Sequence, residues 1–250
     1  MYTNKGDLWN FDAESARILY EVFESSPDGF WYNFYGSMDS MGGDDSVNDF
    51  VEEFISYLNL VHRLSISENA GKTQSMVQCI VNHIRYKYMR KDEIVKLRTE
   101  LLQVDNLINI FRTRFGENLA YRKTAREDLP DPYLPSNTVL ALVESALVHG
   151  LIPKEGDWRL NVDIDENEHG LQILVADNGV GLISSMAASS AGGLERRNNI
   201  EAVNLRLKEH FADQGPEPIS APGSGDMEPV NVSCSGMYNK VTIHLPHYGF

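Results

Sequence analysis

The sequence predicts an α+β fold, with a helical hairpin followed by an α/β sandwich that has helices on one face of a mixed, largely antiparallel sheet. Apolar residues recur at spacings of three and four from about residue 47 to residue 112, which is the period of amphipathic helices. Beyond Gly116 the chain becomes rich in Gly, Pro and short alternating segments. The expected order there, strand, helix, two strands, helix and two strands, is typical of helices packed on a sheet.

Three parts follow along the chain: an acidic and aromatic N-terminal segment (1–46), a helical hairpin (47–113) and a sandwich domain (114–250). The N-terminal segment has helical composition at 12–24 and an aromatic run at 30–35, which is expected to pack on a neighbouring element or to form a partner surface. The hairpin breaks at 65–71. Its apolar stripes have little else to cover them, so we expect a homodimer through the hairpin.

The sandwich domain is predicted from alternating apolar residues and turn signals. A short strand is expected at 119–122 and a helix at 134–149, which Pro135-Ser136-Asn137 would start. Two strands at 158–165 and 171–177 should pair across the turn 166–170, followed by a helix at 199–211 and a strand hairpin at 230–235 and 240–245.

Charge and composition exclude several classes of function. The net charge is -14 over 250 residues, and residues 1–60 contribute -10 of it, from twelve Asp and Glu against Lys5 and Arg17. Such a field repels nucleic acid and anionic membranes, so direct nucleic-acid binding is not expected. No apolar run approaches the ~20 residues that cross a bilayer. With two distant cysteines and no metal-ligand spacing, the expected location is the cytoplasm.

The segment from Ile173 to Leu182 is the most informative motif. Asp177 ends a short apolar strand and is followed by an Asn-Gly-Val-Gly turn. The carboxylate could accept a purine amino group, while Gly179 and Gly181 would let a nucleotide lie close to the backbone. A bulged hairpin and a calcium loop fit the same short pattern.

Four sequence blocks in order resemble the LytS-like sensor histidine kinases, which belong to the GHKL ATPases and hold ATP in a Bergerat-type sandwich. The blocks are residues 96–119, 134–135, 142–150 and 177–181, and the resemblance extends over about residues 48–250. It implies ATP or ADP as the ligand, possible but weak Mg²⁺ binding, a homodimer, and a response regulator of the LytTR type or another kinase as the partner.

The resemblance also assigns the site residues. Glu144 takes the position of the polarising base, and Ser145 replaces the asparagine that helps to hold magnesium. A hydroxyl is a weaker ligand than a carboxamide, so a metal at Ser145 is doubtful. His149 matches the histidine with which the family ends this helix. A histidine at a helix C-terminus is also favoured by the helix dipole alone.

Asp177, Gly179 and Gly181 form the intact adenine block of the family. The phosphate-binding turn Gly-x-Gly-Leu aligns with residues 197–200, where both glycines are missing and Asn199 is the remaining nucleotide-binding candidate. Gly192 and Gly193 could substitute if the loop slides. The late Gly-x-Gly-Thr turn aligns with residues 236–239, and residues 213–229 look like an insertion before it.

The phosphoacceptor histidine of the family aligns with Glu52, which cannot form a stable phosphoramidate. His62 and His83 remain on the helices as substitutes, but packing or surface roles are commoner for such residues. We therefore predict a degenerate kinase that binds adenine nucleotide weakly and acts through protein contacts. The alternatives are an active ATP-dependent protein-histidine kinase that uses Glu144, and a nucleotide-free adaptor.

Overall fold

The computed structural model describes residues 44–90, 93–126, 128–167, 170–180, 191–212, 229–235 and 238–246. The predicted helix at 12–24 and the aromatic run at 30–35 lie outside these residues. The chain divides into two compact units, Met1–Tyr57 and Leu58–Phe250. All elements of the sheet and of the helical layer against it belong to the second unit.

The region predicted to be helical contains three helices. The first two, α3 (Asp44–Ser67) and α4 (Gly71–Ile84), are separated by the predicted break, and α4 continues as a π-helical turn, η1 (Arg85–Met89). The third helix, α5 (Leu97–Phe115), follows a short strand, β1 (Ile94–Lys96). Among the described residues, no helix has both the length and the apolar character needed to cross a membrane.

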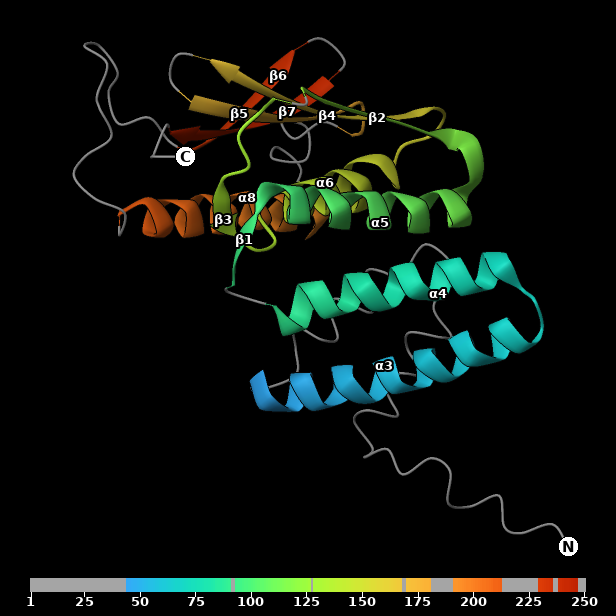
Figure 1. Ribbon diagram of the computed structural model, residues 1–250. Helices are drawn as coiled ribbons and strands as arrows, with labels where there is room; N and C mark the ends of the chain where they lie inside the picture. The colour runs from blue at the N-terminus through green and yellow to red at the C-terminus, as the bar shows by residue number, and fades with distance from the viewer. Residues whose placement is uncertain are drawn as a thin grey trace, which may run out of the picture. The chain divides into compact units, whose positions relative to one another are not determined.

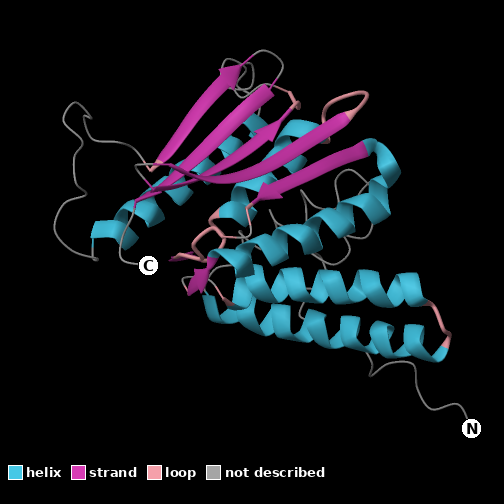
Figure 2. Ribbon diagram, turned by 45° about the horizontal axis from the view of Figure 1, so that its top comes forward, coloured by secondary structure: helices cyan, strands magenta, loops and turns pink. Residues whose placement is uncertain are grey.

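The main sheet has five strands in the order β2-β4-β5-β7-β6, and Figure 2 shows them as one twisted layer. Their bounds are β2 (Leu119–Ala125), β4 (Trp158–Asn167), β5 (Gly170–Asp177), β6 (Val230–Ser235) and β7 (Tyr238–Pro246). β2 pairs with β4 in parallel, and the other neighbours are antiparallel. The predicted mixed, largely antiparallel sheet is confirmed.

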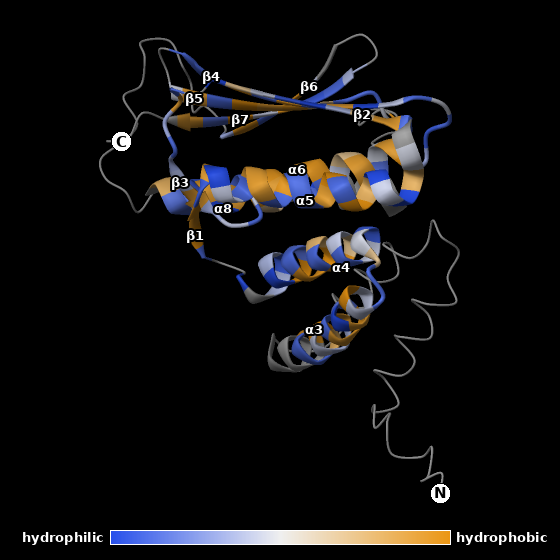
Figure 3. Cartoon of the chain, turned by 45° about the vertical axis from the view of Figure 1, so that its right-hand side comes forward, coloured by the Kyte–Doolittle hydropathy of each residue, from blue (hydrophilic) through white to orange (hydrophobic). Residues whose placement is uncertain are grey.

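The helices α5, α6 (Val139–Ser145) and α8 (Ala191–Ala212) cover one face of this sheet (Figure 1). The alternation along β4 buries Trp158, Leu160, Val162 and Ile164, which is the period-two pattern of a strand with one face inward. These residues share a core with Leu107 and other apolar residues of the helices. Figure 3 shows hydrophobic residues on β5, β7 and α6, where sheet and helices meet.

The helix predicted at 134–149 begins later than expected. Residues 133–135 instead form strand β3 (Tyr133–Pro135), which pairs antiparallel with β1, and helix α6 starts at Val139. Between them, Asn137 has a left-handed backbone with φ 59°. Such a residue ends an extended segment and reverses the chain, so it cannot lie inside a helix. From Ala146 the helix continues as a π-helical segment, η3 (Ala146–Leu151).

Candidate functional site

Asp177 ends strand β5 in a buried position, where its side chain is held by two donors. The residue is 1% exposed. Its Oδ1 accepts hydrogen bonds from the Gly179 N–H and from Asn239 Nδ2, each at 2.9 Å. Asn239 lies directly opposite Asp177 in the β5–β7 ladder. Both donors bind the same carboxylate oxygen, Oδ1. The amino group of an adenine would be a further donor to the Asp177 carboxylate.

Gly179 packs directly against the end of the helical segment that begins with α6. A Cβ atom at this position would lie 2.2 Å from the Gly150 carbonyl oxygen and 2.3 Å from its carbonyl carbon. The next residue, Val180, donates its N–H to the same carbonyl oxygen at 2.8 Å. Glycine is therefore required here by the close approach of two backbones.

Asn178 fixes the turn from its other side. Its Oδ1 accepts from the Arg159 N–H at 2.8 Å, and its Nδ2 donates to the Asp157 carbonyl at 3.1 Å. These bonds tie the end of β5 to the start of β4. Asn178 is thus explained by the turn alone, whereas the buried carboxylate of Asp177 also bonds to Asn239 on the neighbouring strand.

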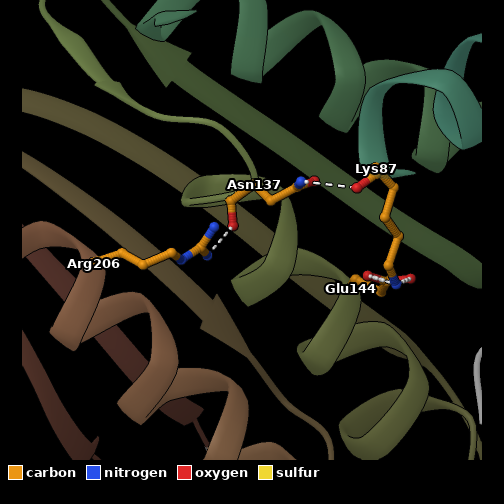
Figure 4. Close-up of polar contacts among 4 residues, drawn as sticks. All are labelled: Lys87, Asn137, Glu144 and Arg206. Atoms are coloured by element: carbon orange, nitrogen blue, oxygen red, sulfur yellow. Dashed lines mark hydrogen bonds and ion pairs between the residues drawn. The ribbon is translucent and has the colours of Figure 1, made fainter. Parts of the chain in front are cut away.

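Glu144, the residue in the predicted polarising position, forms an ion pair with Lys87 of η1 (Figure 4). Lys87 Nζ lies 3.0 Å from Oε1 and 2.9 Å from Oε2 of the carboxylate. The side chains are 24% and 13% exposed, so the pair is largely screened from water. π-Helical segments are rare in proteins, and those that occur often lie at functional sites. Lys87 lies in one such segment, and another begins two residues after Glu144.

Ser145 lies next to Glu144 but faces the interior. It is 2% exposed, and its hydroxyl has no hydrogen-bond partner among the described residues. His149 is half-buried in η3. Among the predicted residues, the structure therefore brings Glu144, Ser145 and His149 onto one continuous helical segment whose end, at Gly150, touches the Asp177 turn.

The resemblance implies magnesium at Ser145, and the residues present do not fit it. No group of three or more His, Cys, Asp and Glu side chains among the described residues could hold a metal ion. Glu144 has both oxygens engaged by Lys87. Unit charges 4 Å apart interact by about 4 kcal/mol at an effective dielectric of 20, so a dication beside this carboxylate would meet strong repulsion from the ammonium group.

The predicted phosphate-binding turn at 197–200 is not a turn. Helix α8 already begins at Ala191, so these residues lie in its interior, where Asn199 is exposed. Gly192 and Gly193 lie in the first turn of the helix instead. Gly181 lies outside the described residues.

The histidines and the residue at the phosphoacceptor position occupy different environments. Glu52 is exposed on α3 and His62 is half-buried there. His83 is 0% exposed near the end of α4, and burial lowers its pKa to about 4, with the nearby Lys87 acting in the same direction and Glu144 opposing it. A neutral histidine enclosed by protein cannot receive a phosphoryl group without local opening.

Several residues that build this region were not singled out from the sequence. Glu100 of α5 is fully buried and accepts from the backbone N–H groups of Asn137, Val139 and Leu140 at 2.7, 2.8 and 3.0 Å. Arg206 of α8 donates to the Ser136 and Asn137 carbonyls at 2.8 and 3.0 Å. Asn137 Nδ2 donates to the Lys87 carbonyl at 3.3 Å (Figure 4). The turn at 136–137 therefore joins η1, α5, α6 and α8.

Comparison with known proteins gives matches to histidine kinases. Residues 48–119 match the family model described as histidine kinase. The sensor histidine kinases YpdA and BtsS of Escherichia coli K12 are 29% and 24% identical over 47% and 72% of this chain. The chain spans 21% and 29% of their respective lengths.

A solved structure, the histidine kinase domain of the blue-light activated histidine kinase EL346 from Erythrobacter litoralis, aligns with a TM-score of 0.39 and 14% identity. The alignment covers 78% of this chain and 95% of that domain. By sequence, residues 48–119 carry the pattern of the histidine kinase family, and the chain is related to sensor histidine kinases.

Proposed function

We propose that this chain is a signal-transduction protein similar to the cytoplasmic part of a sensor histidine kinase, catalytically degenerate, which binds adenine nucleotide weakly and acts through protein contacts. The LytS-like subtype and the Bergerat-type sandwich are part of this proposal. A homodimer through the helical hairpin is expected, with a response regulator of the LytTR type or another kinase as the partner.

The observation that carries nucleotide binding is the buried carboxylate of Asp177 at the glycine turn. The residue is 1% exposed, and its carboxylate is an acceptor that two N–H donors hold in a fixed direction at the end of β5. The donors from Gly179 and Asn239 are neutral N–H groups. An adenine amino group would add a further donor, which is the role that the resemblance implies for this residue.

Loss of phosphotransfer is supported by four positions. Glu52 replaces the phosphoacceptor histidine, and Ser145 replaces the metal-binding asparagine. Glu144 is bound to Lys87 through both carboxylate oxygens, so an attacking group would have to displace the lysine to reach either oxygen. His83, one of two substitute acceptors, is buried.

Asp177→Asn is expected to weaken ATP and ADP binding at least about tenfold, because an amide turns one acceptor oxygen into a donor where the adenine amino group also donates. Isothermal titration of the full chain measures the change. Asp163→Asn, a substitution in the middle of β4, serves as the control and should bind as the wild type does. If the wild-type chain gave neither heat of binding nor a thermal shift at saturating nucleotide, the nucleotide-free adaptor would be favoured. The hydrogen bonds of Asn178 fix the turn without a nucleotide and agree with that alternative.

The active-kinase alternative makes an opposite prediction for labelled ATP. We expect no acid-labile phosphate on the wild-type chain, since neither Glu52 nor the enclosed His83 can hold or receive it readily. The assay is incubation with ATP labelled at the γ-phosphate, followed by acid and alkali treatment. A label that disappears with His62→Gln or His83→Gln would establish phosphotransfer and refute the degenerate assignment.

A further inference from the structure

Lys87 occupies both oxygens of the carboxylate in the predicted polarising position, Glu144. Its ammonium group lies 2.9 and 3.0 Å from the two oxygens of Glu144. A bidentate contact of this kind places a full positive charge on the carboxylate that precedes Ser145. The sequence offers no local pattern that pairs these residues, since they are 57 positions apart.

The position of Lys87 is fixed by the second unit itself. Its carbonyl accepts from Asn137 Nδ2 at 3.3 Å, and the Asn137 carbonyl accepts from Arg206 at 3.0 Å. Asn137 also donates its N–H to the buried Glu100 at 2.7 Å. Lys87 is therefore anchored at both ends, by its backbone at the 136–137 turn and by its side chain at Glu144.

The Lys87–Glu144 pair lies within reach of a ligand at Asp177. From Glu144 to Gly150 the helical segment advances by at most about 9 Å, the value for the α-helical rise of 1.5 Å per residue, because Ala146–Leu151 is π-helical and rises less per residue. At Gly150 it touches Gly179 and Val180 of the Asp177 turn. A polyphosphate attached to a base at Asp177 can span such a length, so its anionic end would reach the Lys87–Glu144 pair.

We propose that Lys87, and no magnesium ion, neutralises the Glu144 carboxylate at the phosphate end of the site, so that this chain binds ADP and ATP independently of divalent metal. The inference rests on the proposed nucleotide binding. Lys87 neutralises Glu144 and thereby removes the repulsion that a lone carboxylate would exert on phosphates. It is a positioning and specificity residue, and it makes the lost asparagine at position 145 unnecessary.

The test compares nucleotide affinity with and without metal. ADP and ATP are titrated calorimetrically into the full chain in excess EDTA and in excess MgCl₂. For the wild type we expect dissociation constants that agree within about twofold between the two conditions. Lys87→Met should weaken binding in EDTA about tenfold, because Glu144 is left uncompensated, and magnesium should then recover part of the loss.

Three further variants separate this role from a structural one. Lys87→Arg keeps the charge and should retain metal-independent binding. Glu144→Gln leaves the lysine charge unopposed and should strengthen nucleotide binding in EDTA. Lys72→Met removes an exposed lysine of α4 and should leave both constants unchanged. Thermal melts of each variant report on folding, and the wild-type comparison alone remains decisive if Lys87→Met does not fold.

The outcomes distinguish this inference from the proposed function. Wild-type binding that strengthens tenfold or more with magnesium would overturn the inference and leave nucleotide binding intact. A folded Lys87→Met variant that binds as tightly as the wild type in EDTA would likewise overturn the inference alone. No binding in either condition would overturn both proposals.

Discussion

Gly179→Ala is expected to lower the free energy of unfolding by about 2 to 4 kcal/mol, more than an ordinary surface substitution. The added Cβ would lie 2.2, 2.3 and 2.7 Å from three backbone atoms of Gly150. Because these atoms belong to the backbone, no side-chain rotation can relieve the overlap. The turn would have to move away from the helical segment, with loss of the Val180–Gly150 hydrogen bond.

Urea denaturation followed by circular dichroism measures this change. The matched control is Gly71→Ala, because a Cβ at Gly71 meets nothing within 4 Å and alanine is the better helix former at the start of α4. The control should be neutral or slightly stabilising. A free energy of unfolding for Gly179→Ala within about 0.5 kcal/mol of the wild-type value, the range of surface substitutions, would contradict this prediction. It would show that the close approach of Gly179 to Gly150 does not contribute to stability.

Glu100→Ala is expected to cost about 3 to 5 kcal/mol, the range for breaking a buried polar network. Glu100 accepts from three backbone N–H groups and from the Tyr86 hydroxyl. Burial raises its pKa, and these four hydrogen bonds oppose that shift. Alanine would leave the donors at the start of α6 buried without acceptors, which carries the full desolvation cost of each.

The same denaturation experiment separates the network from simple loss of charge. Tyr86→Phe removes one of the four donors and should cost clearly less than Glu100→Ala, about 1 kcal/mol. Glu201→Ala changes an exposed glutamate of α8 and should have almost no effect. If Glu100→Ala proved no more destabilising than Glu201→Ala, the buried carboxylate would not be what holds α6 in place.

Long periodic segments made most of the sheet predictable. The strands at 158–165, 171–177, 230–235 and 240–245 were expected from alternation; the strand at 230–235 appears with these bounds, and the other three are longer by one to three residues. The strands β1 and β3 were missed because three residues carry no readable period. Pro135, a common first residue of helices, lies instead in β3, where pairing with Ile94 outweighs the local preference.

The site was predictable where a motif is local and unpredictable where it depends on distant pairing. Asp177 and its glycine turn were found from sequence because strand, carboxylate and glycines are contiguous. Asn239 could have been found from the β5–β7 register, had the pairing been assigned, since it is opposite Asp177. Lys87 and Glu100 gave no signal, because their partners are 57 and 37 to 40 positions away.

The ladder that sets Asn239 against Asp177 also makes the geometry around this carboxylate tolerant of changes in chain length. Asn239 is placed by hydrogen bonding of β7 to β5 and β6, and the distance along the chain between α8 and β6 has no part in that register. Lengthening a connection costs only slowly increasing closure entropy. A change in the number of residues between α8 and β6 should therefore leave the Asp177 carboxylate in place.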